Sequence, residues 1–139
     1  MRSVATFGAL LLLFAFNASP KEAPEVKQIL AQIAGKEKLP AKQVFKNLKL
    51  LGNVPAERLL RIMDIGYSQS LGVSCDHCHV EDRWEADEKR PKRAAREMIL
   101  FVNRINEQLG QMDEIDSGEA TVNCTTCHRG DVKPALQMR

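Results

Sequence analysis

Apolar residues recur at helical spacing near the start of the chain, between Pro24 and Gly35. They occupy one helix face and consist of Val26, Ile29, Leu30 and Ile33. Proline suits the first turn of a helix and glycine its end, so the pattern predicts a short amphipathic helix. Residues 39–55 follow with apolar and basic positions that share no single period, which predicts an irregular connector with local turns.

Two further stretches carry the helical period, from Pro55 to Gly72 and from Pro91 to Gly110. The apolar face of the first is formed by Leu59 or Leu60 with Met63, Tyr67 and Leu71, and that of the second by Met98, Phe101 or Val102, Ile105 and Leu109. Both begin with a proline and end at a glycine, as helices often do. Gly66 weakens the first helix by about 1 kcal/mol, so we still expect it to form.

No stretch alternates apolar and polar residues as a half-buried strand does. The pattern therefore predicts an all-α fold, one small irregular helical domain over residues 20–139. The 139 residues leave room for one core and hardly for two. The formal net charge is only +2, so nothing indicates a nucleic-acid partner.

Residues 1–19 contain an apolar run from Val4 to Phe16 that follows one basic residue. This run is short for a membrane span and fits the core of a secretory signal peptide. A cut after Ala18 would leave the bulky Phe16 where a small residue is usual, so an uncleaved N-terminal membrane anchor is the alternative. We expect residues 20–139 to be periplasmic or otherwise extracytoplasmic, either soluble or anchored.

All 4 cysteines and all 3 histidines lie in two short stretches, VSCDHCHV at 73–80 and VNCTTCHRG at 122–130. Each contains the pattern Cys-x-x-Cys-His, formed by Cys75, Cys78 and His79 in the first and by Cys124, Cys127 and His128 in the second. Cysteines three residues apart lie one turn apart, so their sulfurs can reach two points on the edge of one flat ring. The next residue, a histidine, is then carried under the ring, where its imidazole can bind iron.

This spacing is typical of c-type haem attachment, so two copies predict two covalently bound haem c groups with the helical domain wrapped around them. Aromatic residues make up only 5% of the chain, which agrees with porphyrins that supply flat apolar volume. A zinc ribbon would place its cysteine pairs about 15–20 residues apart, far closer than Cys78 and Cys124. Disulfides need no histidine after each pair, and a thioredoxin-like pair needs a strand–helix setting.

A second axial ligand for each iron must come from outside the two motifs, where the sequence has no histidine. His77, inside the first motif, is expected to be a loop residue turned away from its own haem. Met63 and Met98 lie mid-helix on apolar faces, one helix before each motif, whereas Met112 lies in a polar loop. A methionine on an apolar face is often only core filler, so the residues alone leave this choice open.

Five segments of the chain resemble the cytochrome subunit of bacterial photosynthetic reaction centres and its shorter relatives in non-photosynthetic bacteria. They read NLKLLGNVPAERLLRIM, SLGVSCDHCHV, DEKRPKRAAREM, RIN and VNCTTCHRG, and the resemblance covers roughly residues 44–134. In that family each haem unit is a helix with an axial methionine, then a turn and Cys-x-x-Cys-His. The resemblance implies that Met63 faces the iron of His79 and Met98 that of His128, with Met112 as the rival of Met98. The photosynthetic subunit carries four haems, so this chain corresponds to one two-haem half.

Histidine and methionine together leave no open position on an iron, which favours electron transfer over oxygen or peroxide chemistry. We therefore expect an electron-transfer protein rather than an enzyme. It would pass single electrons between other redox proteins, and a small soluble electron carrier or a membrane-bound redox complex is the expected class of partner. The alternative is a dihaem enzyme or sensor, peroxidase-like or gas-binding, in which one axial methionine is displaced. We interpret the basic run KRPKRAAR as a solvated helix start interleaved with acidic residues, in preference to a docking patch.

Overall fold

The computed structural model describes residues 22–115, 120–134 and 136–137. Its elements in chain order are α1 (Pro24–Gln32), α2 (Ala41–Val44), α3 (Ala56–Arg61), the π-helix η1 (Ile62–Gln69), the 3-10 turn η2 (Cys75–His77), α4 (Arg90–Leu109) and α5 (Cys124–His128). The described ranges contain isolated bridges but no β-strand, which confirms the expected all-α fold. The leader expected at 1–19 lies outside these residues.

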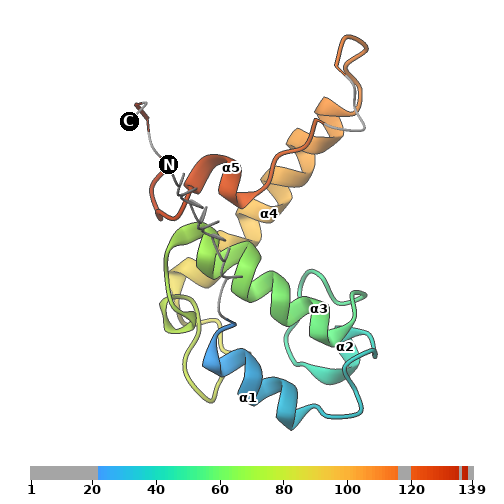
Figure 1. The fold of residues 1–139 in the computed structure, drawn as a ribbon, viewed down its shortest axis with the longest axis vertical. Coiled ribbons are helices and arrows are strands. Elements are labelled where there is room, and N and C mark those ends of the chain that lie inside the picture. Colours follow the sequence, from blue (N-terminus) through green and yellow to red (C-terminus); the bar gives the residue numbers. More distant parts are fainter. Residues whose placement is uncertain (1–21, 116–119, 135, 138–139) are drawn as a thin grey trace, which may run out of the picture.

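A small apolar core lies between α1 and α3, in the lower half of Figure 1. Its buried members are Val26, Ile33, Ala56 and Leu60, with Val44 and Phe45 of the connector packed against them. The helix expected after Pro24 is confirmed, and its apolar face meets α3. Among the described residues no large side chain is completely buried, so protein side chains alone build only a modest core.

The connector at 39–55 folds back so that its two ends meet. The N–H of Ala41 donates to the carbonyl of Val54 at 2.8 Å, and the N–H of Ala56 donates to that of Leu39 at 2.9 Å. The connector was expected to be irregular and does contain local turns, one of which is the four-residue helix α2. These bonds fix the start of α3.

The helix expected over 55–72 forms, but the expectation of one regular α-helix is wrong. After Arg61 the backbone widens into the π-helix η1, which includes Met63, Gly66 and Tyr67. Gly66 brings no side chain into the widened turn, and the Ser70 hydroxyl donates to the carbonyl of Ile65, five residues earlier, at 3.2 Å. π-Helical turns are rare and often mark functional sites.

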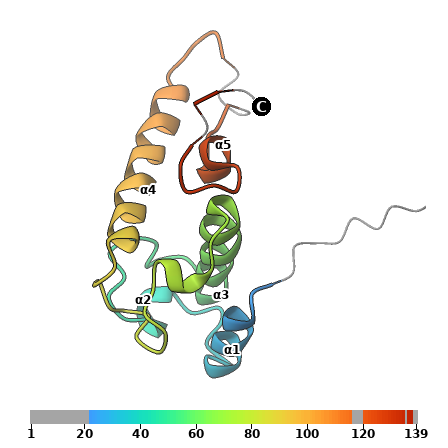
Figure 2. The same cartoon turned by 90° about the vertical axis from the view of Figure 1, so that its left-hand side faces the viewer.

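The longest helix, α4, has few contacts with the other described helices, although Asn106 exchanges two hydrogen bonds with the backbone of Val122. Figure 2 shows it as a separate column beside α3, η1 and α5, and it packs extensively on none of the other described helices. Its apolar side chains Met98, Leu100 and Phe101 are exposed. The strongest helix of the sequence thus forms as expected, from Arg90 to Leu109, but its apolar stripe has little protein to cover it. No helix in the described ranges is long and apolar enough to cross a membrane.

Candidate haem sites

The first cysteine motif is a tight turn held by backbone hydrogen bonds. The N–H groups of Cys78 and His79 both donate to the carbonyl of Cys75, at 3.2 and 3.0 Å. Cys75 and Cys78 are free thiols, and burial raises the pKa of each above its ordinary value. The turn therefore presents two protonated sulfurs and, directly after them, an imidazole.

The second motif is a one-turn helix, α5, that is closed at its start by a capping box. The Asn123 side chain accepts from the Thr126 N–H at 3.2 Å, and the Thr126 hydroxyl accepts from the Asn123 N–H at 3.1 Å. Such reciprocal bonds satisfy N–H groups that would otherwise lack partners. Arg129 ends the turn in the left-handed region, with φ 52°. Cys124 and Cys127 are free thiols here as well.

Both motif histidines hold their Nδ1 atoms against backbone carbonyls. Nδ1 of His79 lies 2.9 Å from the carbonyl oxygen of Trp84, and Nδ1 of His128 lies 3.0 Å from that of Asp131. A carbonyl oxygen only accepts, so each Nδ1 must carry the hydrogen. In a neutral imidazole the free lone pair is then on Nε2, which is how proteins orient histidines that bind metals. The sequence carries no signal for these acceptors, because they lie in irregular turns after each motif.

The environment of His79 keeps its imidazole neutral. Burial is the main reason that its pKa lies below the ordinary value, and the positive charges of Lys92 and Arg96 add to the effect. The Trp84 ring packs beside it, with 5.7 Å between ring centroids and 56° between planes. A neutral, oriented imidazole is the form that binds iron.

The structure joins the two motifs through the end of η1. The carbonyl of Ser70 accepts from the Gly130 N–H at 2.8 Å, directly after the second motif. Gly72 meets Gly130 so closely that a Cβ at Gly72 would lie 2.1 Å from the Gly130 carbonyl oxygen. Segments more than fifty residues apart are therefore in backbone contact, and the thiols of the two motifs belong to one connected region.

Tyr67 lies within this region, close to one cysteine of each motif. Burial is the first cause that raises the pKa of Tyr67 to about 12, and negative charge on Cys124 or Cys78 would raise it further. The sequence placed Tyr67 on the apolar helix face with Met63 and gave no hint of its position beside Cys124. That position depends on the docking of α5 against η1, which no local pattern encodes.

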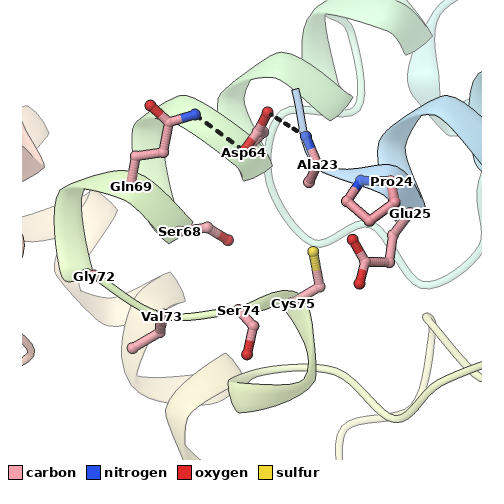
Figure 3. A pocket seen from close by; sticks show the side chains of 10 residues that line it. All are labelled: Ala23, Pro24, Glu25, Asp64, Ser68, Gln69, Gly72, Val73, Ser74 and Cys75. Carbon is pink, nitrogen blue, oxygen red and sulfur yellow. Dashed lines mark hydrogen bonds between the residues drawn. The ribbon is translucent and has the colours of Figure 1, made fainter. Parts of the chain in front are cut away.

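A pocket of about 450 Å³ opens beside the first motif, between α1 and the end of η1. In Figure 3 the Cys75 sulfur points toward Glu25 on α1, with Asp64 on the opposite helix. The buried Asp64 carboxylate accepts from the Ala23 N–H at 3.3 Å and from the Gln69 side chain at 3.2 Å. The carboxylates of Glu25 and Asp64 add to the effect of burial on the Cys75 pKa, so this thiol stays protonated and reachable from the pocket.

The three candidate methionines differ in how firmly the protein holds them. Met63 is half-buried in η1, whereas Met98 is 41% exposed on α4 and Met112 is 48% exposed in the turn after it. Their assignment as axial ligands stays a prediction. The chemistry of the donor set nevertheless fits a c-type haem at each motif, with two free thiols, an Nδ1-anchored imidazole and exposed apolar side chains on α4.

The basic run at the start of α4 is interleaved with acidic residues as expected, but the expectation that it is solvated is wrong for part of it. Lys92 is buried, and its Nζ lies 3.3 Å from Oδ1 of Asp87. The same oxygen lies 2.9 Å from the guanidinium nitrogen Nη2 of Arg96. Arg93 donates to the backbone carbonyls of Asp87 and Glu88. The turn before α4 folds back over the helix start, so these side chains bind the protein itself.

Known proteins resemble this chain over most of its length. A family model described as "Photosynthetic reaction centre cytochrome C subunit" matches residues 15–137. The photosynthetic reaction center cytochrome c subunits of Roseobacter denitrificans and Rubrivivax gelatinosus are each 33% identical, over 101 and 95 residues, which are 68% of this chain and 26% and 25% of theirs. Cytochrome c-554 of Chloroflexus aurantiacus is 29% identical over 83 residues, 59% of this chain and 20% of its own.

The length of these matches bears on what they establish. The chain spans about a quarter of the length of the two reaction-centre subunits that it matches. The matched range nevertheless includes both cysteine motifs, α4 and the whole of α3 and η1. The match over residues 15–137 confirms the resemblance in the motifs, and the chain belongs to the photosynthetic reaction centre cytochrome c subunit family.

Proposed function

We propose that the chain is an exported dihaem c-type cytochrome that transfers single electrons between redox partners. The observation that carries this proposal is the repeated arrangement of two free thiols followed by an imidazole whose Nδ1 is held by a carbonyl. Each haem, when bound, supplies one iron that exchanges a single electron. The membership of a cytochrome c family supports the same class of function.

The chain's own residues have distinct parts in this proposal. Cys75 and Cys78 form the thioether bonds of the first haem, and Cys124 and Cys127 those of the second. Nε2 of His79 and of His128 would bind the iron, since the carbonyls of Trp84 and Asp131 hold Nδ1 of each ring. Met63 and Met98 would supply the remaining ligand of the first and the second iron. These contacts fix the ligands and so reduce the reorganisation that accompanies each transfer.

The junction at the end of η1 suits transfer between two neighbouring haems. Ser70 and Gly72 contact the segment of the second motif directly, so both attachment sites belong to one packed unit. A haem at each motif would then lie near its neighbour, and the pair would act as a short wire. Tyr67, half-buried near a cysteine of both motifs, lies in the same region.

The partners and the location form a separate part of the proposal. We infer a domain over residues 20–139 outside the cytoplasm, behind a signal peptide or anchor at 1–19. Relatives are named as reaction-centre subunits, but this chain spans a quarter of their length. We therefore propose redox partners only by class, as a small soluble electron carrier or a membrane-bound redox complex.

One observation favours a second candidate function, a dihaem enzyme or gas sensor. Met98 and Met112 are both exposed, so the second iron has the less firmly held methionine of the two. A displaceable ligand would open that iron to peroxide or to a diatomic gas. Electron transfer remains the better supported reading, because the family is one of cytochrome c subunits.

Carbon monoxide separates the two candidate functions. The protein is produced in a host that attaches haem c, its covalent haem is quantified from the pyridine haemochrome spectrum, and the reduced form is then mixed with carbon monoxide. We expect two haems per chain and no change in the spectrum on mixing. Prompt binding at either haem would contradict the carrier function, and a colourless protein would contradict covalent haem altogether.

A further inference from the structure

Lys92 is a buried lysine at the start of α4, and its ammonium group binds the turn that follows the first cysteine motif. Only 9% of the residue is exposed. Nζ donates to the carbonyl oxygens of Trp84 at 2.8 Å and of Ala86 at 2.7 Å, and lies 3.3 Å from Oδ1 of Asp87. Lysines are rarely buried to this degree without partners, and this one uses backbone carbonyls.

The Trp84 carbonyl is shared between Lys92 and the first motif's histidine. Its oxygen accepts from Nδ1 of His79 at 2.9 Å and from Nζ of Lys92 at 2.8 Å. A carbonyl oxygen has two lone pairs, so both bonds can exist together. A bond from a charged donor is the stronger of the two, and it draws electron density away from the bond to the imidazole.

We propose that Lys92 is a positioning residue that raises the reduction potential of the haem held by His79, acting through the Trp84 carbonyl. This inference rests on the proposed function. A weaker bond from Nδ1–H makes the imidazole a poorer electron donor to iron, which favours the reduced state. The buried ammonium group acts in the same direction, because a nearby positive charge disfavours the more positive oxidised iron.

The rest of the turn offers a matched control for charge. Arg93 follows Lys92 on the same helix and also donates to backbone carbonyls, those of Asp87 and Glu88, but it is exposed and does not bind Trp84 in the structure. Arg93→Gln therefore removes one positive charge from the same turn and leaves the shared carbonyl intact. The second motif is an internal reference, since His128 donates to Asp131 in a different segment.

The test is a spectroelectrochemical titration of the haem-loaded wild type, Lys92→Met, Lys92→Gln, Lys92→Arg and Arg93→Gln. At a fixed potential we expect the Met and Gln variants to lower the ratio of reduced to oxidised protein about tenfold for one haem, a shift of about 59 mV for a one-electron couple. The other haem should keep its potential, and both should stay low-spin. Lys92→Arg should restore most of the wild-type potential, and Arg93→Gln should have a much smaller effect.

Two results would overturn the inference. One is an unchanged potential in Lys92→Gln, which keeps a hydrogen-bond donor at the site and serves as the folded variant if Lys92→Met does not fold. The other is an equal fall of the potential in the Arg93 and Lys92 variants, which would leave only a general effect of charge. Failure of the proposed function can be told apart from failure of this inference, because the wild-type protein would then carry no covalent haem.

Discussion

Ser70 and Thr125 connect the two halves of the chain, with their hydroxyl oxygens 2.6 Å apart across 55 residues of sequence. Ser70 is only 4% exposed, and its carbonyl also accepts from the N–H of Gly130. Thr125 lies inside the second cysteine motif, between Cys124 and Cys127. The position of the second motif relative to η1 therefore depends on this pair.

Removing the Thr125 hydroxyl should destabilise the protein. Thr125→Val keeps the shape of the side chain and leaves the buried Ser70 hydroxyl without this partner. We expect the free energy of unfolding to fall by about 1 kcal/mol, measured by chemical denaturation followed by circular dichroism. Thr121→Val, an exposed threonine just before the motif, is the control and should change little. Equal stabilities of the two variants would show that the hydroxyl pair contributes nothing.

Gly72 should tolerate no side chain. A Cβ there would lie 2.1 Å from the Gly130 carbonyl oxygen, and the backbone has φ +64°. Gly35 has φ +82° with nothing within 4 Å of its added Cβ, so Gly35→Ala measures the cost of the backbone conformation alone. We expect Gly72→Ala to cost about 1–3 kcal/mol more than Gly35→Ala in thermal or chemical unfolding. Similar losses in both variants would argue against close contact between the segments.

The stability of the protein at alkaline pH should report the burial of Tyr67. Its pKa is raised to about 12, against about 10 in an unfolded chain. Between these values the unfolded chain loses a proton that the folded chain keeps, so the free energy of unfolding falls as pH rises from about 10 to about 12. Tyr67→Phe has no phenol to titrate, so its free energy of unfolding should not show this contribution to the fall. Over this pH range, wild type should lose on the order of 2 kcal/mol more of its free energy of unfolding than Tyr67→Phe. Parallel pH profiles of the two proteins would contradict the burial of Tyr67.

The ion pair of Asp87 with Arg96 should make stability sensitive to acid. The bond from Arg96 is the largest cause that holds the pKa of Asp87 well below its usual range. A lowered folded-state pKa means that the stabilisation is present above about pH 4 and is lost as pH falls further. Asp87→Asn should therefore be less stable than wild type at neutral pH, and the difference should shrink in acid. Glu81→Gln, which also removes one negative charge but at an exposed acid nearby, is the matched control.

The sequence was sufficient to predict the features that depend on the period of apolar residues and on the spacing of a short motif. The helix after Pro24, the long helix from Arg90 to Leu109 and the two cysteine motifs follow from apolar periodicity and from a short motif. It was insufficient where distant segments decide the structure. The bond between Ser70 and Thr125 and the burial of Lys92 both require a loop to fold back, and such folding leaves no periodic pattern in the sequence. Lys92 looks solvated within a charged run, yet the turn before it supplies carbonyl partners.

The π-helix is a further case in which local reasoning was incomplete. Apolar spacing over 55–72 fits an ordinary helix, and Gly66 indicated only a weaker one. The structure widens the turn over Ile62–Gln69, where the Ser70 hydroxyl binds the Ile65 carbonyl. The register of Met63 and Tyr67 within η1 therefore depends on a side chain beyond its end.

The axial methionines give a prediction that separates the two candidates for the second iron. We expect Met63→Ala and Met98→Ala each to convert one haem from low spin to high spin, because each would remove one iron ligand. Met112→Ala, in the turn after α4, is the comparison and should leave both haems low-spin. Electron paramagnetic resonance of the oxidised proteins measures the change. A normal spectrum for Met98→Ala together with a high-spin signal for Met112→Ala would transfer the assignment to Met112.

A redox titration of the wild-type protein followed by optical spectroscopy tests the central claim most directly, because it reports haem number, ligation and working potential together. We expect two separate one-electron steps, each with the spectrum of a low-spin haem c bound by histidine and methionine. A single step, a high-spin haem in the untreated protein, or a protein that binds no haem at all would contradict it.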